Sequence, residues 1–163
     1  MNIKVGDKAP DFTLTTLTAD GPSLLTLSEH TAGSKAVLLF VPMAFTGVCT
    51  DEFCQVSEDL DAYEGLGAKV IGISGDNPFA QKEWAEKNGI KLTLVSDYEH
   101  KVTQDYGVAY DSFLPEKNLT MGGVPKRSAF VIDADGVVQY AEVNDNPGDL
   151  PNLAAIKETL KKI

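Results

Sequence analysis

The chain has 163 residues, of which 43% are hydrophobic and 23% are charged, an ordinary balance for a folded globular protein. The formal net charge of -10 makes nucleic acid and anionic lipid poor partners. The sequence shows no secretory signal, no apolar run near the roughly 18 residues of a membrane span, and too few cysteines for a disulfide scaffold. We therefore expect a soluble cytoplasmic protein, folded as one domain over residues 1–163, that binds neither membrane nor nucleic acid.

The elements expected in the first half alternate between buried strands and helices. A continuous apolar run predicts a strand at residues 36–41, and apolar positions at helical spacing predict a helix over about residues 50–63. A second buried strand is expected at residues 68–74. Asn77 followed by Pro78 is typical of a helix start, with Asn77 as the cap.

The second half is expected to add three strands and a closing helix. These elements are expected at residues 92–95, 128–132, 137–143 and 151–160. A hairpin turn joins the last two strands, and residues 111–123 show no clear period, which predicts a loop over one face. Strands that alternate with helices predict a largely parallel α/β sheet, to which the late hairpin adds an antiparallel edge.

Cys49 falls between the strand expected at residues 36–41 and the helix that follows. A helix start presents unpaired N–H groups and the positive end of the helix dipole, and both favour a thiolate over a thiol. Thr46 carries a hydroxyl three residues upstream, and Pro42, which has no N–H, can wall one side of a pocket. Taken alone, Cys49 is better explained as a small buried hydrophobic residue. The spacing P-x-x-x-T-x-x-C shifts the interpretation toward chemistry.

Cys54 is the only other cysteine and follows Cys49 by five positions. This spacing is not the C-x-x-C of common zinc sites or of thioredoxin-like redox motifs, so a zinc site would need distant ligands that the sequence does not reveal. We expect neither metal nor cofactor. Residues five apart on an intact helix point about 140° away from each other, whereas a disulfide needs Cα atoms within about 7 Å. The two cysteines can therefore bond only if the helix start unwinds.

The chain resembles the peroxiredoxins, a family of thiol peroxidases, and within it the alkyl hydroperoxide reductase E and peroxiredoxin Q (bacterioferritin comigratory protein) types. Pro42, Thr46 and Cys49 fill the family motif without a mismatch. Arg127 falls where the family's arginine stands, and residues 5–12 look like the family's usual start. The resemblance spans nearly the whole chain. It implies an α/β, thioredoxin-like fold in which helices flank a central mixed sheet with an N-terminal β-hairpin extension.

The resemblance also implies a reaction. The Cys49 thiolate attacks hydrogen peroxide or an organic hydroperoxide and becomes a sulfenic acid. Arg127 favours the thiolate and supplies N–H donors to the charge that develops on the leaving oxygen. The Thr46 hydroxyl and the N–H groups of Val48 and Cys49 complete this cradle of donors, and Pro42 keeps water from the sulfur.

Two charged residues have a plainer interpretation beside the one that the resemblance implies. Glu52 matches a position that often orients the arginine in relatives, and it reads equally well as a first-turn glutamate that complements the helix dipole. Arg127 alone reads as a surface charge at a strand end, which the motif makes the weaker interpretation.

The resemblance leaves the recycling step with alternatives. In the peroxiredoxin Q type, a second cysteine five residues after the first closes an intramolecular disulfide. Some peroxiredoxins with the motif Ala-Phe-Thr-Gly-x-Cys rely instead on an external thiol. This chain combines both features. We expect Cys54 to resolve the Cys49 sulfenic acid, with melting of the helix start, and a thioredoxin-like dithiol to reduce the disulfide. The alternative for Cys54 is a buried helix-face residue with no role.

Three other functions and two further questions stay open at this point. The alternative functions are a one-cysteine peroxidase, a peroxide-responsive redox sensor, and a thiol–disulfide oxidoreductase, against which the missing C-x-x-C argues. Residues 111–123 carry apolar side chains that can wall the site and favour organic hydroperoxides, pack inward, or form a dimer face. Monomer and homodimer both fit the sequence.

Overall fold

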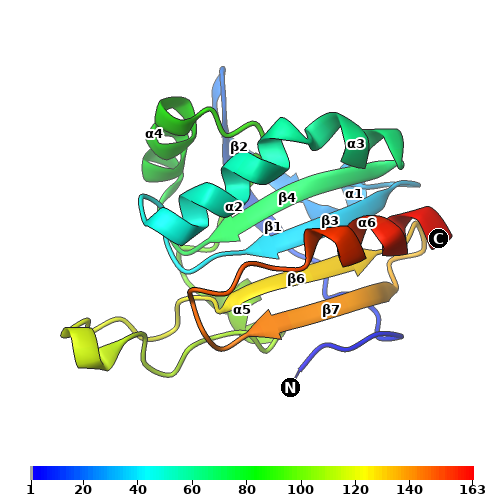
Figure 1. Ribbon diagram of the computed structural model, residues 1–163. Coiled ribbons are helices and arrows are strands. Elements are labelled where there is room, and N and C mark those ends of the chain that lie inside the picture. Colours follow the sequence, from blue (N-terminus) through cyan, green and yellow to red (C-terminus); the bar gives the residue numbers. More distant parts are fainter. Residues whose placement is uncertain (1) are drawn as a thin grey trace.

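Within residues 2–163, which the computed structural model describes, seven strands form one sheet in the order β2-β1-β5-β4-β3-β6-β7 (Figure 1). The strands are β1 (Thr13–Thr18), β2 (Gly21–Thr26), β3 (Lys35–Phe40), β4 (Ala68–Ser74), β5 (Thr93–Ser96), β6 (Arg127–Ile132) and β7 (Val138–Asn144). The helices are α1 (Leu27–His30), α2 (Gly47–Glu58), α3 (Leu60–Gly65), α4 (Pro78–Asn88), α5 (Lys101–Asp105), the 3-10 helix η1 (Pro115–Lys117) and α6 (Leu153–Lys162).

Helices cover both faces of the sheet and bury two apolar cores (Figure 1). On one face α2, α4 and α6 contribute fully buried side chains, among them Phe53, Trp84 and Ile156. On the other face the shorter α1 and α5 contribute Leu27 and Val102. The strands in the middle of the sheet serve both cores, because successive side chains of a strand point to opposite faces.

The sheet is mixed, which corrects the largely parallel sheet that the alternation of strands and helices predicted. Only β3, β4 and β5 pair in parallel among the described strands. The hairpin β1–β2 joins β5 in antiparallel fashion, and β6 and β7 add antiparallel strands beside β3. The alternation of strands and helices did not predict this arrangement because β6 follows a long loop rather than a helix crossover. The chain therefore returns in the opposite direction. The mixed sheet with an N-terminal hairpin, which the family resemblance implied, is confirmed.

Several predicted boundaries agree with the structure and two do not. Strand β4 has the predicted limits, and Asn77 caps α4 by accepting a hydrogen bond from the Ala80 N–H at 2.8 Å. The helix expected over about residues 50–63 begins earlier, at Gly47, and is divided at Asp59 into α2 and α3. The segment 111–123 is a loop that contains η1. The early start of α2 matters most, because it places Cys49 inside the first turn.

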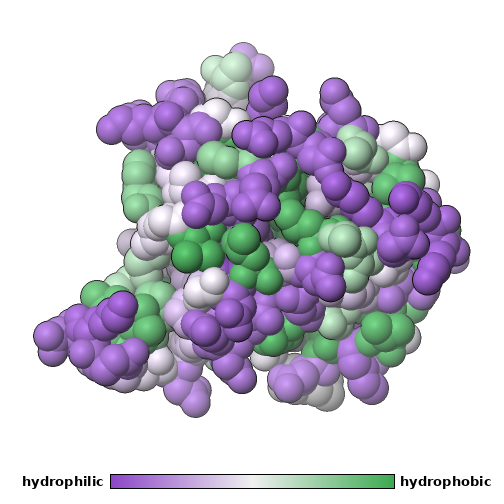
Figure 2. Space-filling model, in the orientation of Figure 1, coloured by the Kyte–Doolittle hydropathy of each residue, from purple (hydrophilic) through white to green (hydrophobic). Residues whose placement is uncertain are grey.

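The surface is largely polar. Figure 2 shows hydrophilic residues over most of the viewed face, with smaller apolar areas between them. The loop that carries η1 projects from the body of the molecule in the same view (Figures 1 and 2). Across residues 2–163, none of the helices has the length and apolarity that a membrane crossing requires.

Candidate active site

Cys49 is the third residue of α2, directly after the loop that leaves β3. Thr46 is the N-cap of this helix, and its carbonyl accepts the N–H of Thr50 at 3.0 Å. The N–H groups of Gly47, Val48 and Cys49 therefore lie in the first turn, where a helix offers them no carbonyl. Cys49 therefore lies at the end of α2 where the helix dipole is positive.

Arg127 is the first residue of β6, and its side chain is 1% exposed. Its Nη2 donates a hydrogen bond to the Cys49 Sγ at 3.3 Å. Its Nη1 donates to the Glu52 Oε1 at 3.0 Å, while Nε and Nη2 both donate to the Pro147 carbonyl, at 3.2 and 2.9 Å. The interpretation of Arg127 as a surface charge is therefore wrong. Burial alone lowers its pKa, but the pKa of Arg127 is raised overall because Cys49 and Glu52 both favour the cation.

Glu52 is fully buried and forms an ion pair with Arg127. Because α2 begins at Gly47, Glu52 lies beyond the first turn, and its interpretation as a first-turn glutamate is wrong. Burial raises the pKa of Glu52 to about 7, against the opposing effect of the Arg127 charge. Within residues 2–163 no group hydrogen-bonds to its Oε2. Glu52 thus accepts one hydrogen bond from the guanidinium and keeps its second carboxylate oxygen unbonded among the described residues.

The Thr46 hydroxyl donates its hydrogen bond within its own loop. Its Oγ1 donates to the Met43 carbonyl at 2.8 Å, which uses its only proton. Toward a bound molecule Thr46 can therefore act only as an acceptor in this arrangement. This differs from the cradle of donors that the resemblance implied, and the donor that hydrogen-bonds to the Cys49 Sγ is the Arg127 guanidinium.

A cavity of about 430 Å³ opens over Cys49 and Arg127. Its walls come from the loop between β3 and α2, from the start of α2, from the loop with η1, and from the turn after β7. The lining residues are Pro42, Met43, Thr46, Gly47, Val48, Cys49, Phe113, Leu114, Lys117, Leu119, Arg127, Asn146, Pro147 and Gly148. Hydrogen peroxide is only slightly larger than a water molecule, whose share of liquid volume is about 30 Å³. The cavity therefore has room for a much larger molecule, and much of its wall is apolar.

Cys54 lies elsewhere on the intact helix α2, and both cysteines are free. Its Sγ donates a hydrogen bond to the Asn88 carbonyl of α4 at 3.4 Å. Burial raises the pKa of Cys54, and the nearby Asp51 and Glu58 raise it further. The structure thus brings together five of the six predicted site residues and leaves Cys54, protonated at neutral pH, outside the cavity.

The sequence did not reveal the turn between β7 and α6. The Pro147 carbonyl accepts two hydrogen bonds from Arg127, and Asn146 and Gly148 join it in the cavity wall. A run of turn-forming residues at 144–149 was the available signal for a loop. Every residue has a backbone carbonyl, however, so residue type does not indicate which carbonyl contacts Arg127.

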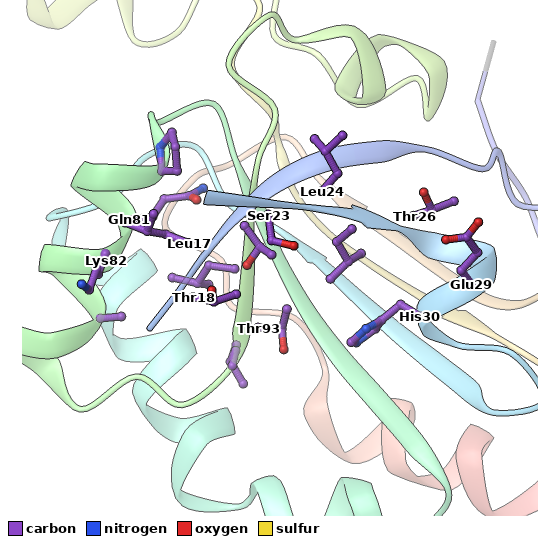
Figure 3. A pocket seen from close by; sticks show the side chains of 16 residues that line it. Leu17, Thr18, Ser23, Leu24, Thr26, Glu29, His30, Gln81, Lys82 and Thr93 are labelled. Atoms are coloured by element: carbon purple, nitrogen blue, oxygen red, sulfur yellow. The ribbon is translucent and has the colours of Figure 1, made fainter. Parts of the chain in front are cut away.

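A second cavity, of about 590 Å³, lies between the hairpin β1–β2 and α4 (Figure 3). Figure 3 shows side chains from both sides of it, including Leu24 and Ser23 of β2 and Gln81 and Lys82 of α4. None of the six predicted site residues lines this cavity. It is therefore separate from the candidate active site.

Comparison with known proteins gives consistent matches. The family model for the AhpC/TSA family matches residues 5–141. The chain is 32% identical to "Alkyl hydroperoxide reductase E" of Mycobacterium bovis over 150 residues, which covers 91% of this chain and 90% of the relative. It is 36% identical to "Peroxiredoxin Q, chloroplastic" of Oryza sativa subsp. japonica over 138 residues, which covers 85% of this chain and 58% of the relative. The crystal structure of peroxidoxin BcpB from Mycobacterium tuberculosis superposes with a TM-score of 0.84 at 28% identity, covering 99% of each chain.

Proposed function

The chain belongs to the AhpC/TSA family of peroxiredoxins, which are thiol-dependent peroxidases, and from this premise we propose that Cys49 is its peroxide-reducing nucleophile. The family membership predicted from the motif is confirmed. One observation carries the proposal for Cys49: its Sγ accepts a hydrogen bond from the buried Arg127 at 3.3 Å, and both residues line one cavity with several apolar side chains. A buried cation and a helix N-terminus that meet at one sulfur favour the thiolate, which is the reactive form.

The proposed first step forms one bond and breaks one. The Cys49 thiolate attacks the distal oxygen of ROOH, an S–O bond forms, and the O–O bond breaks to release RO⁻. This anion takes a proton from solvent to give ROH, and Cys49 becomes a sulfenic acid. Arg127 and the N–H groups of Val48 and Cys49 stabilise the charge on the leaving oxygen. Thr46, whose own proton is donated to Met43, accepts the hydrogen bond of the hydroperoxide O–H and so fixes its orientation.

The cavity supports organic hydroperoxides as substrates alongside hydrogen peroxide. Phe113, Leu114 and Leu119 contribute one wall, and Pro42, Met43 and Val48 contribute the other. An apolar R group that covers these side chains gains about 25 cal/mol for each Å² of apolar surface it removes from water. Hydrogen peroxide has no such group. Of the three arrangements that the sequence allowed for residues 111–123, the wall over the site is the one that the cavity supports.

We propose that Cys54 resolves the sulfenic acid after the first turns of α2 unwind. Four hydrogen bonds of α2 with its surroundings break in this proposal before Cys54 reaches Cys49. They are the bonds Trp84 to Thr50 at 2.9 Å, Arg127 to Glu52 at 3.0 Å, Arg127 to Cys49 at 3.3 Å and Cys54 to Asn88 at 3.4 Å. Unwinding also exposes Cys54 to water, which removes the burial that raises its pKa and so increases its thiolate fraction. The product is a Cys49–Cys54 disulfide and one water molecule.

Reduction of that disulfide requires an external dithiol. Peroxiredoxins are recycled by thioredoxin-type reductants, and we propose the same class for this chain. Thiolate attack on the disulfide needs an accessible sulfur, and the unwound helix start provides one. The pair of free cysteines suits the reducing cytoplasm.

Stopped-flow fluorescence of Trp84 tests the nucleophile, because its indole bonds to Thr50, the residue after Cys49. Wild-type protein mixed with tert-butyl hydroperoxide is expected to show a rapid change and to consume one equivalent. The Cys49→Ser variant should show neither, whereas Cys54→Ser should keep the first step. Peroxide consumption by Cys49→Ser at the wild-type rate would overturn the assignment.

A separate measurement tests the resolving cysteine. After one equivalent of peroxide, mass spectrometry of alkylated peptides should find Cys49 and Cys54 joined. A persistent Cys49 sulfenic acid beside a free Cys54 thiol would instead establish the one-cysteine cycle with an external thiol. The intact helix and the Cys54–Asn88 bond are the observations that favour this second candidate.

A further inference from the structure

The loop between β3 and α2 has a single hydrogen-bonded tether to the rest of the described chain (cyan in Figure 1). The last sheet-type bond before it is donated by the Val41 N–H to the Ile73 carbonyl at 3.0 Å. From there to Gly47, the bond that leaves the loop is donated by the Ala44 N–H to the Asp76 Oδ2 at 2.7 Å. The Thr46–Met43 bond lies within the loop and ties it only to itself. Asp76 therefore supplies the hydrogen bond that connects this loop to the rest of the protein, while Ala44 also packs in the core.

The loop also holds a strained conformation. Phe45 has a φ of 66°, in the left-handed region that non-glycine residues rarely adopt, and its side chain is 55% exposed. Such a conformation persists only where the surrounding structure fixes it. The Thr46–Met43 bond closes this turn from within, and Ala44 beside it is buried in the core. The bond from the Ala44 N–H to Asp76 is the hydrogen bond that connects the turn, and with it Thr46 and the start of α2, to the rest of the protein.

Asp76 is itself held by buried polar groups. The Ser96 hydroxyl donates to the Asp76 carbonyl at 2.6 Å. Ser74, two residues earlier, accepts a bond from the Gln81 amide at 2.9 Å, and the same amide donates to the Val95 carbonyl. All three of these polar side chains are buried. Buried polar groups are costly unless they are satisfied, and here they satisfy one another at the segment that presents Asp76.

We propose that Asp76 is a positioning residue for peroxide reduction. It fixes the loop between β3 and α2 so that Thr46 and the first turn of α2 face Arg127. The inference rests on the proposed function of Cys49. Arg127 has an anchor outside α2, the Pro147 carbonyl, and it meets α2 itself through Glu52 and Cys49, so the alignment of the two halves of the site depends on how the loop and the start of α2 are held. Asp76 does not line the cavity, so it acts through the loop. A misplacement of about 1 Å in such a site costs about 10²-fold in rate.

Two neutral substitutions separate the hydrogen bond from the charge. Asp76→Asn keeps an oxygen that can accept from the Ala44 N–H, whereas Asp76→Ala removes the acceptor. Asn77→Ala is the matched control, because it removes a similar hydrogen bond one residue along, the cap of α4, without touching the loop. Measurements are the rate constant with tert-butyl hydroperoxide, the pH profile of Cys49 alkylation in a Cys54→Ser background, amide hydrogen exchange of residues 41–50, and thermal unfolding.

We expect Asp76→Ala to lower the peroxide rate constant by about 10- to 100-fold and to speed amide exchange in residues 41–50. Asp76→Asn should stay within a few-fold of wild type. Asn77→Ala should unfold at a lower temperature yet keep both the rate and the exchange pattern. A wild-type rate in folded Asp76→Ala would overturn the proposal, as would equal losses in the alanine and asparagine variants.

The test remains informative if one arm fails. If Asp76→Ala does not fold, an Asp76→Asn protein with wild-type rate and wild-type exchange at residues 41–50 supports the acceptor role, and one with a large loss contradicts it. If wild-type protein consumes no peroxide, the proposed function fails on its own. The exchange and alkylation measurements then still decide whether Asp76 holds the loop.

Discussion

The two halves of the active site are held in place very differently. Arg127 stands on β6, whose six residues are all buried and which pairs with a strand on each side. Its guanidinium makes four hydrogen bonds to three partners. Cys49 stands on α2, whose entry loop is tethered by one hydrogen bond to Asp76 and includes the exposed Phe45.

This difference matches what each half does in the proposed cycle. The cation serves only the peroxide-reducing step, and electrostatic stabilisation is strongest when donors are fixed before the reaction. The nucleophile must be aligned for that step and must then leave the site so that Cys54 can reach it. A segment that moves has to come from the weakly held part of a structure. The predictions below remove anchors from one half or the other and ask whether the two respond differently.

The largest effect is expected in the half of the site that contains Arg127 on β6. Arg127→Gln should lower the peroxide rate constant by about 10²–10³-fold, the usual loss on removing a donor to developing negative charge. The variant should also lose about 3–5 kcal/mol of unfolding free energy, because Glu52 is left buried without its partner. Urea unfolding and stopped-flow kinetics measure the two losses separately.

The double variant Arg127→Gln, Glu52→Gln separates stability from catalysis. Removing both charges together replaces a broken ion pair with two neutral amides, so most of the lost stability should return. The peroxide rate constant should stay low because no cation faces Cys49. Recovery of the rate in the double variant would mean that Arg127 acts only by supporting the fold.

A second effect, on the ion pair that joins Arg127 of β6 to Glu52 of α2, depends on pH. Since the pKa of Glu52 is raised from 4.5 to about 7 on folding, the folded state binds a proton that the unfolded state releases. Wild-type stability should therefore fall between pH 4.5 and about 7, by on the order of 3 kcal/mol, with no further loss from this group above that range. Glu52→Gln cannot titrate and should lack this slope.

Urea unfolding at pH 5 and pH 8 checks this prediction. The stability of Glu52→Gln relative to wild type should rise from the lower to the higher pH. Glu116→Gln is the control, because Glu116 is exposed on η1 and its removal should leave the wild-type slope unchanged. Equal slopes in wild type and Glu52→Gln would show that Glu52 is ionised throughout this range.

The contrast between the two halves also explains which features the sequence predicted. Strand β4 and the cap Asn77 were found because local patterns determine them. The motif located Pro42, Thr46 and Cys49, and the match to the family's arginine located Arg127, all of which line one cavity. These are features of residue type and spacing, which a sequence states directly.

The features that the sequence did not predict are contacts between distant parts of the chain. The direction of β6 follows from pairing with β3, which no local pattern encodes. The Pro147 carbonyl bonds to Arg127, and the Asp76 carboxylate bonds to the loop before α2, each from a distant part of the chain. The Thr46 proton was expected to face substrate, but the loop turns it toward Met43. Such contacts depend on tertiary structure, so they become visible only in the folded chain.

The smallest effect is expected in the half of the site that contains Cys49 on α2. The Trp84 indole N–H donates to the Thr50 Oγ1, one residue past Cys49, and this bond must break when α2 opens. Trp84→Phe keeps an aromatic ring against Phe53 but removes the donor. A neutral hydrogen bond contributes about 1 kcal/mol, so the open state should become about five-fold more populated. Disulfide formation after peroxide addition should accelerate by the same factor, measured by quenched flow and mass spectrometry.

A control is needed because Trp84→Phe also removes core volume. Val138→Ala truncates a fully buried residue of the other core, on the opposite face of the sheet from α2, and should lower stability without speeding disulfide formation. If both variants accelerate disulfide formation equally, opening is a general loosening of the fold. If Trp84→Phe alone accelerates it, the opening is local to α2. The peroxide rate constant should stay near wild type in Val138→Ala, since Arg127 and the tether at Asp76 remain in place.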